Sequence, residues 1–157
     1  MILEWASALE ASALGAWMRG SSWGYPAVNV AHVAGLVLLL GSMILLDLRI
    51  LGAGRGAIKL PAASGVLTPF AGAGLMLLIV SGLLLFAADG APLLQNPLFL
   101  PKILLIALGI TNAVVFRARW GHMADQACAP LGARMQAALS LAVWVAAATL
   151  GRLLAYV

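Results

Sequence analysis

Residues 27–48 read AVNVAHVAGLVLLLGSMILLDL, an almost unbroken apolar stretch in which His32 and Asp47 are the ionisable side chains. A helix needs about 20 mostly apolar residues to cross the hydrocarbon core of a bilayer. The stretch has that length, and it lacks the alternation of apolar and polar residues that marks a membrane β-strand. It therefore predicts a transmembrane helix.

Three further stretches have the same character, namely residues 65–87, 97–116 and 135–156. Of the 157 residues, 64% are hydrophobic and 9% are charged, whereas a soluble domain carries about 25% charged residues. This composition excludes a soluble enzyme, a nucleic-acid-binding protein and a disordered tail. We expect an all-α integral membrane protein, with a four-helix transmembrane domain in residues 21–157 that contacts lipid and binds no nucleic acid.

Residues 1–20 differ from the four spans because polar and apolar residues share this segment. Its apolar side chains recur at helical spacing, with acidic and hydroxyl side chains largely elsewhere: Leu3, Ala6, Leu9, Ala13 and Trp17. This pattern predicts a short amphipathic helix that lies in the membrane interface, with Trp5, Trp17 and Trp23 at the level of the headgroups. Two acidic residues and the lack of a basic start argue against a secretory signal peptide.

The cationic side chains predict the orientation. Six of the nine lie in the two connections on one side of the bundle, residues 49–64 and 117–134: Arg49, Arg55, Lys59, Arg117, Arg119 and Arg134. Cytoplasmic loops carry an excess of Lys and Arg. We therefore expect a bacterial inner-membrane protein with both termini in the periplasm and with residues 88–96 as its outer connection.

Three nitrogen-bearing side chains lie at a similar depth near the outer face, each on a different span: His32, Lys102 and Arg152. Ionisable groups in a membrane are costly and mark candidate functional sites. The alternatives are that Lys102 and Arg152 extend to the headgroups and that His32 has a packing role. Together the three predict a site for an anionic or metal-bearing ligand, with Asp89 as a nearby carboxylate.

Other polar residues predict structural roles. Asp47 and Arg49 at the inner end of the first span are expected to pair with each other or to cap neighbouring spans. Asn112 is expected to hydrogen-bond between helices. His122 and Cys128 share a loop and have the chemistry of soft-metal ligands, with a solvated loop as the simpler reading. Cys128 is the single cysteine, which excludes an intrachain disulfide.

The first span resembles the opening helix of two bacterial families, the HemJ-type protoporphyrinogen oxidases and the CopD-like copper-resistance membrane proteins. Residues 31–52, AHVAGLVLLLGSMILLDLRILG, share with both an early histidine, a small-residue break and an arginine at the inner end. These are His32, Gly41 and Arg49. A closer likeness is to small uncharacterised bacterial four-helix membrane proteins with the layout H…GS…DLR…K…NA..FR.

The next two spans resemble the HemJ-type family alone. Residues 67–86, LTPFAGAGLMLLIVSGLLLF, match its Thr-Pro start at Thr68 and Pro69 and its later glycine at Gly82. Residues 99–119, FLPKILLIALGITNAVVFRAR, match its lysine at Lys102 and its basic inner end. The resemblance covers about residues 27–120. The HemJ-type third span has a further histidine near the place of Asn112, and this chain lacks it.

The HemJ-type resemblance implies haem b bound by His32, a lysine needed for activity at Lys102, and the oxidation of protoporphyrinogen IX. The CopD-like resemblance implies copper handling at the outer face. Three hypotheses therefore stay open: a haem-binding redox protein, in which Lys102 and Arg152 hold the propionates; a transporter of copper or a small anion; and a structural subunit of an oligomer or a larger complex.

Overall fold

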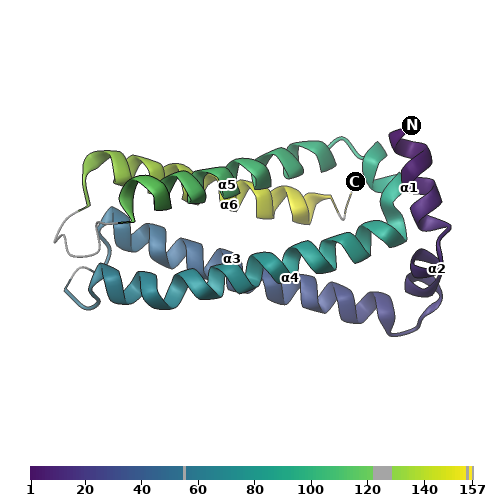
Figure 1. Ribbon diagram of the computed structural model, residues 1–157, viewed down its shortest axis with the longest axis horizontal. Coiled ribbons are helices and arrows are strands. Elements are labelled where there is room, and N and C mark those ends of the chain that lie inside the picture. The colour runs from purple at the N-terminus through teal and green to yellow at the C-terminus, as the bar shows by residue number, and fades with distance from the viewer. Residues whose placement is uncertain (55, 122–128, 155, 157) are drawn as a thin grey trace.

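The computed structural model describes residues 1–54, 56–121, 129–154 and 156. Within these ranges the chain forms helices and connecting turns (Figure 1). The helices are α1 (Ile2–Glu10), α2 (Ala13–Gly20), α3 (Gly24–Leu51), α4 (Leu60–Gln95), α5 (Phe99–Trp120) and α6 (Leu131–Leu153). The last four are long and apolar enough to cross a membrane. This arrangement confirms the predicted fold class, an all-α multi-pass membrane bundle.

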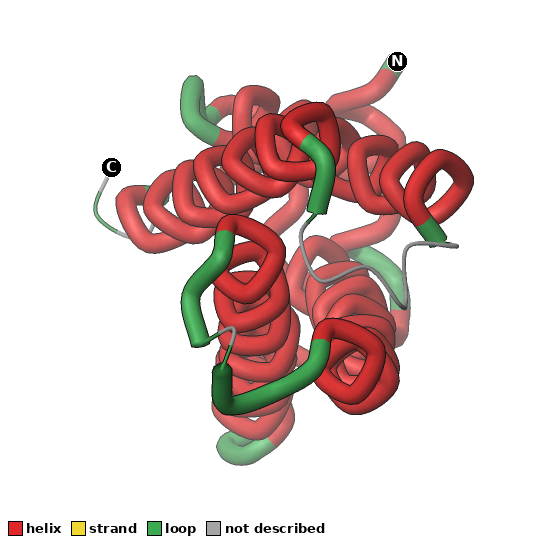
Figure 2. The backbone as a smooth tube through the Cα atoms, turned by 90° about the vertical axis from the view of Figure 1, so that its left-hand side faces the viewer, coloured by secondary structure: helices red, strands yellow, loops and turns green. Residues whose placement is uncertain are grey.

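The four long helices form two antiparallel pairs, α3 with α4 and α5 with α6 (Figures 1 and 2). α3 also packs along α6 and joins the two pairs, whereas α4 and α5 scarcely touch. The start of α1 and the end of α6 lie at the same end of the bundle (Figure 1). We call this the terminal end, and the opposite end, where α3 joins α4, the loop end.

Glycines allow the helices of each pair to approach closely. A Cβ atom on Gly74 would lie 2.5 Å from the Leu39 backbone nitrogen and 2.8 Å from the Gly35 carbonyl oxygen. In the other pair, a Cβ on Gly109 would lie 2.9 Å from the Trp144 indole. Small residues have this role in membrane bundles because they bring backbones into van der Waals contact. Between the two pairs, Leu39, Ala71 and Trp144 form the buried core.

The N-terminal segment contains two helices where the sequence predicts one. Ser12 divides them, because its hydroxyl accepts a hydrogen bond from the Gly15 backbone N–H and caps α2. Both helices pack on the C-terminal part of α4 and bury Ala6 and Met18 there. Their tryptophans remain exposed, Trp5 by 64% and Trp17 by 56%, which fits the amphipathic character expected from the sequence.

α4 is longer than the sequence predicts and takes in most of the expected outer connection. It begins at Leu60 with Pro61 in its first turn and continues to Gln95, so Pro69 lies inside the helix. The backbone leaves helical geometry at Asp89, three residues before Pro92. Proline has no N–H and its ring clashes with the carbonyl four residues earlier, which accounts for this kink. The helix resumes after it.

The N-terminal helices supply the hydrogen bonds that the kink removes from α4. The Arg19 guanidinium donates to the Ala88 carbonyl at 2.8 Å, the group that Pro92 leaves without a helical donor. The Glu10 carboxylate accepts from the Ala91 backbone N–H at 2.6 Å. Buried backbone polar groups need such partners. Helices α1 and α2 therefore complete the terminal end of α4.

Candidate functional site

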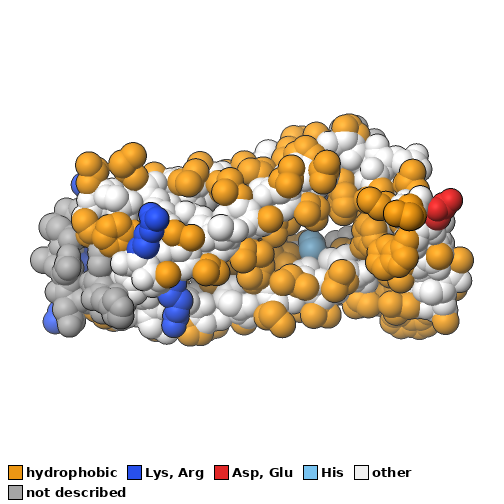
Figure 3. Space-filling view, turned by 45° about the horizontal axis from the view of Figure 1, so that its top comes forward, with side chains coloured by type: hydrophobic (Ala, Val, Ile, Leu, Met, Phe, Trp, Pro, Cys, Tyr) orange, Lys and Arg blue, Asp and Glu red, His pale blue; other side chains and the backbone are white. Residues whose placement is uncertain are grey.

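His32 lies on α3, half-buried between α3 and α4, and its ring nitrogen Nδ1 is 2.9 Å from the Ser81 hydroxyl of α4. Ser81 donates its single hydrogen to the Leu77 carbonyl at 2.5 Å. The hydroxyl can then only accept from His32, so Nδ1 carries the imidazole hydrogen and Nε2 keeps a free lone pair. In Figure 3 a histidine ring is visible inside a hollow between apolar side chains.

Two other residues complete the surroundings of His32. Gly82 has no side chain to cover the ring, since a Cβ there would lie 3.4 Å from His32 Cε1. The half-buried Lys102 side chain lies against Gly151 of α6, whose Cβ position is 3.6 Å from the lysine Nζ. The lysine charge is near enough to act on the imidazole. Lys102 is therefore within electrostatic range of His32, while its side chain lies against α6.

Arg152, the third residue of the predicted cluster, has a local partner instead. It is exposed, its guanidinium lies over the Tyr156 ring at 4.7 Å, and it donates to the Tyr156 hydroxyl. Asp89 faces the Tyr25 side chain at the kink of α4. Neither residue is placed with His32 by these contacts.

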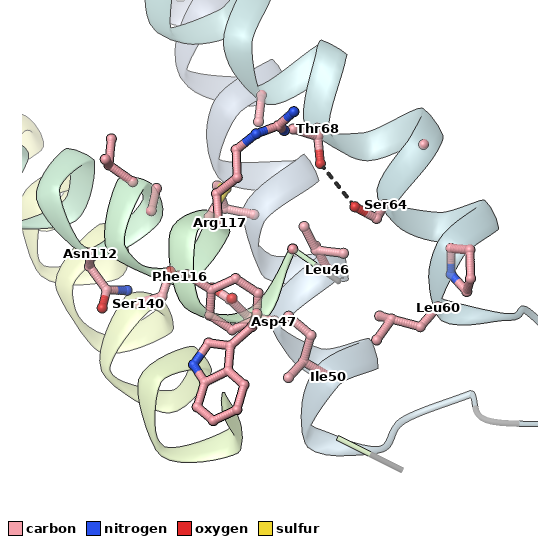
Figure 4. A pocket seen from close by; sticks show the side chains of 18 residues that line it. Leu46, Asp47, Ile50, Leu60, Ser64, Thr68, Asn112, Phe116, Arg117 and Ser140 are labelled. Atoms are coloured by element: carbon pink, nitrogen blue, oxygen red, sulfur yellow. Dashed lines mark hydrogen bonds between the residues drawn. The ribbon is translucent and has the colours of Figure 1, made fainter. Parts of the chain in front are cut away.

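A second polar region lies at the loop end, where the pairs α3–α4 and α5–α6 separate and leave a half-open cavity of about 710 Å³. All four long helices contribute to its walls (Figure 4). Its polar side chains are Asp47, Ser64, Thr68, Asn112, Arg117 and Ser140. Asp47 and Asn112, which the sequence marks as structural, both lie on this cavity.

Asp47 and Arg49 do not pair with each other. The Arg49 guanidinium donates to the Ile58 carbonyl at 2.7 Å and so ties the end of α3 to the turn before α4. Asp47 is 3% exposed, and its Oδ2 has no hydrogen-bond partner among the described residues. Ser140 lies near it, also 3% exposed, and its hydroxyl has no partner in the same part of the chain.

Asn112 forms hydrogen bonds between α5 and α6. Its side-chain nitrogen donates to the Gln136 carbonyl at 3.3 Å, and the Gln136 side chain donates back to the Asn112 carbonyl at 3.1 Å. The Gln136 side-chain oxygen accepts from the Trp120 indole at 3.0 Å. This reciprocal network fixes α5 against α6 beside the cavity.

The proposed soft-metal pair, His122 and Cys128, lies outside the described residues. Within the described ranges, no three His, Cys, Asp or Glu side chains are grouped as they would be around a metal ion.

No protein-family model matches the chain, and no curated protein and no solved structure matches it.

Sequence reasoning did not single out three residues that the structure places at these sites. Ser81 orients His32, Gln136 holds Asn112, and Ser140 faces Asp47. Each is an isolated polar residue in an apolar span, and this isolation is the sequence signal that could have identified it.

Proposed function

We propose that this multi-pass membrane protein binds haem b at the terminal end of the bundle, with His32 Nε2 as an axial ligand and a redox or tetrapyrrole-related role. The observation that supports the proposal is the Ser81–His32 hydrogen bond at 2.9 Å. A metal-binding histidine generally donates its other ring N–H to an acceptor, which fixes the tautomer and the ring orientation. His32 already has this arrangement.

The donor set favours haem over copper. A copper ion held by protein needs several ligands, and the described residues offer no group of three His, Cys, Asp or Glu side chains. A porphyrin supplies four nitrogens itself, so one imidazole suffices to attach it. Gly82 keeps the ring uncovered on its side, since a side chain there would contact the imidazole.

The charges near His32 also fit a haem. Lys102 lies within electrostatic range of the imidazole and offers a cation to a propionate. Arg152, bonded to Tyr156, would have to exchange that contact to serve as a second cation. Within the described residues neither Met18, fully buried, nor Met76, 62% exposed, suits a second axial position. That position is left to solvent, to a small ligand or to a second copy of the chain.

The test is an absorption spectrum of the protein purified in mild detergent from cells grown with a haem precursor. We expect a Soret band in the wild type and its loss in His32→Gly. Because misfolding would also remove the band, imidazole is then added. Recovery of the band with added imidazole shows that the pocket is intact and that only the ligand was missing.

His122→Ala is the matched control, since it removes the other histidine of the chain. We expect it to keep the wild-type spectrum. A colourless wild-type preparation with no tetrapyrrole in its lipid extract would end the haem proposal. A band that depends on His122 rather than His32 would end it equally.

For the location and assembly of the protein, we infer a bacterial inner-membrane protein that has its terminal end in the periplasm and forms a homo-oligomer. Six of the nine cations belong to the loop-end segments, which supports this orientation. A C-terminal alkaline phosphatase fusion should be active and a C-terminal green fluorescent protein fusion dark. Native mass spectrometry from mild detergent gives the number of copies.

A further inference from the structure

The cavity at the loop end is separate from the His32 site. Asp47, on the cavity wall, lies fifteen residues after His32 on α3, about 22 Å along the helix axis. The cavity volume of about 710 Å³ falls in the range of small-molecule pockets, roughly 300–1,000 Å³. The proposed haem site makes no use of this cavity.

The cavity opens toward the side of the bundle, between α4 and α5. These two helices scarcely touch, whereas α3 packs along α6 and closes the opposite side. Val114 of α5 lies on the cavity and is 64% exposed, so the cavity wall continues onto the outer surface of the bundle. Because that outer surface contacts lipid chains, a lipid molecule can reach the cavity directly from the bilayer.

The polar side chains deep in the cavity are not open to a ligand. Asp47 and Ser140 are each 3% exposed and face each other. Asn112 is 8% exposed, and its side-chain nitrogen donates to the Gln136 carbonyl. The deep part of the cavity therefore presents mainly apolar side chains to a ligand, among them Met43, Leu46, Leu60 and Phe116. Such walls suit a hydrocarbon chain.

The polar groups that a ligand can meet lie near the helix ends. The Arg117 side chain is exposed, and in Figure 4 it extends away from the Asp47 carboxylate toward Thr68. The half-buried Ser64 and Thr68 hydroxyls lie on the α4 wall and hydrogen-bond to each other at 3.3 Å. Arg117 and Ser64 are three and four residues from the end of α5 and the start of α4, about 4–6 Å along the axis. These groups are therefore near the level of the lipid headgroups.

The charge of the loop end favours an anionic ligand. Residues 47–64 and 117–134 contain six cations and two carboxylates, and one of the carboxylates is the buried Asp47. Figure 3 shows Lys and Arg side chains toward the loop end and an acidic side chain at the terminal end. Arginine binds phosphate through charge-assisted hydrogen bonds, and basic pockets between transmembrane helices recognise anionic headgroups. The cavity thus combines a cation at headgroup level with apolar walls below it.

We propose that the loop-end cavity binds an anionic phospholipid, with the lipid phosphate at the Arg117 guanidinium and an acyl chain against the apolar walls. The Ser64 and Thr68 hydroxyls offer a further hydrogen bond to the headgroup oxygens. The lipid enters between α4 and α5 and fills the space that these helices leave between them. The site is independent of haem binding, and its test needs no haem.

The experiment is native mass spectrometry of the full chain in detergent micelles, titrated with dioleoylphosphatidylglycerol. Dioleoylphosphatidylcholine has the same chains without the net charge, and glycerol 3-phosphate has a phosphate without the chains. We expect phosphatidylglycerol to bind at least about fivefold more tightly than phosphatidylcholine, as one cation near an anionic headgroup implies. Glycerol 3-phosphate should not displace it. Equal binding of the two lipids, or displacement by glycerol 3-phosphate, would overturn the proposal.

Two arginine variants test whether the cation on the cavity is responsible. Arg117→Gln and Arg119→Gln remove the same charge from exposed positions two residues apart on α5, but Arg119 does not line the cavity. We expect Arg117→Gln to weaken phosphatidylglycerol binding by about fivefold or more and Arg119→Gln to bind as the wild type does. An equal loss in both variants would mean diffuse attraction to a basic surface and would contradict the proposal.

Two glycine variants test whether the lipid occupies the cavity itself. A Cβ on Gly65 or on Gly72 of α4 would have nothing within 4 Å, and Gly65 lines the cavity whereas Gly72 lies outside it. Gly65→Phe should fill the cavity and weaken phosphatidylglycerol binding by about fivefold or more, and Gly72→Phe should leave it unchanged. Size-exclusion profiles and helical circular dichroism establish that each variant is folded. Undiminished binding in folded Gly65→Phe would refute the cavity as the lipid site.

Discussion

Gly74 and Gly72 lie two residues apart on α4, and they offer a direct test of how α3 and α4 are held together. A Cβ on Gly74 would lie 2.5 Å from the Leu39 backbone nitrogen and 2.9 Å from the Leu38 Cβ. A Cβ on Gly72 would have nothing within 4 Å outside its own helix. The same substitution, glycine to alanine, therefore meets backbone at one position and open space at the other.

The expected magnitude follows from the distances. Ordinary van der Waals contact of a Cβ begins at 3.4 Å, so Gly74→Ala requires α3 and α4 to part by about 0.9 Å at their crossing point. A gap of about 0.5–1 Å forfeits a quarter to a half of each contact energy. Overpacking of this kind costs about 1–3 kcal/mol. Gly72→Ala should instead stabilise the helix by up to about 1 kcal/mol.

The assay is unfolding in mixed micelles with a rising fraction of sodium dodecyl sulfate, followed by far-ultraviolet circular dichroism. We expect Gly74→Ala to unfold at a lower fraction than the wild type and Gly72→Ala at the same fraction or a higher one. The comparison cancels effects of alanine that do not depend on packing. Coincident unfolding curves for the two variants would refute the close approach of α3 and α4 at Gly74.

Two further predictions concern polar contacts. Glu10→Ala removes the acceptor of the Ala91 N–H. Because this loss costs about 1.5 kcal/mol, it should accelerate hydrogen exchange around the α4 kink by about tenfold. Glu4→Ala, on the exposed side of α1, is the control and should leave hydrogen exchange at the kink unchanged. Gln136→Leu removes two hydrogen bonds, those of its side chain with the Trp120 indole and the Asn112 carbonyl, and leaves the one from Asn112 to the Gln136 backbone carbonyl. It should lower the free energy of unfolding by about 2–3 kcal/mol, measured by the same detergent titration.

The four spans could be predicted from the sequence because length and apolar content are sufficient to identify a transmembrane helix. The ends of the spans were harder to predict. Residues 88–96 read as a loop because Gly90 and Pro92 interrupt the apolar pattern, yet α4 continues to Gln95. Glu10 and Arg19, some seventy or eighty residues away, form hydrogen bonds with the interrupted backbone and support it. A reading of local pattern cannot include such distant partners.

The polar residues show the same limit. Depth along each span grouped His32, Lys102 and Arg152, but depth does not specify which face of a helix a residue occupies. The structure turns Lys102 toward α6 and leaves Arg152 exposed against Tyr156. The sequence predicts that Asp47 pairs with Arg49 or caps a neighbouring span. Its burial beside a cavity depends on the poor packing of α4 against α5, which no single span reveals.

The arrangement of the core bears on the transporter hypothesis. A conduit for copper or an anion would need polar groups continuously along the bundle, because an ion is costly in an apolar medium. His32 and Asp47 lie on the same helix, but Leu39 lies between them and is packed with Ala71 and Trp144 in the buried core. This apolar layer separates the two polar regions in the part of the chain that the structure describes. It interrupts a polar path between the two ends of the bundle.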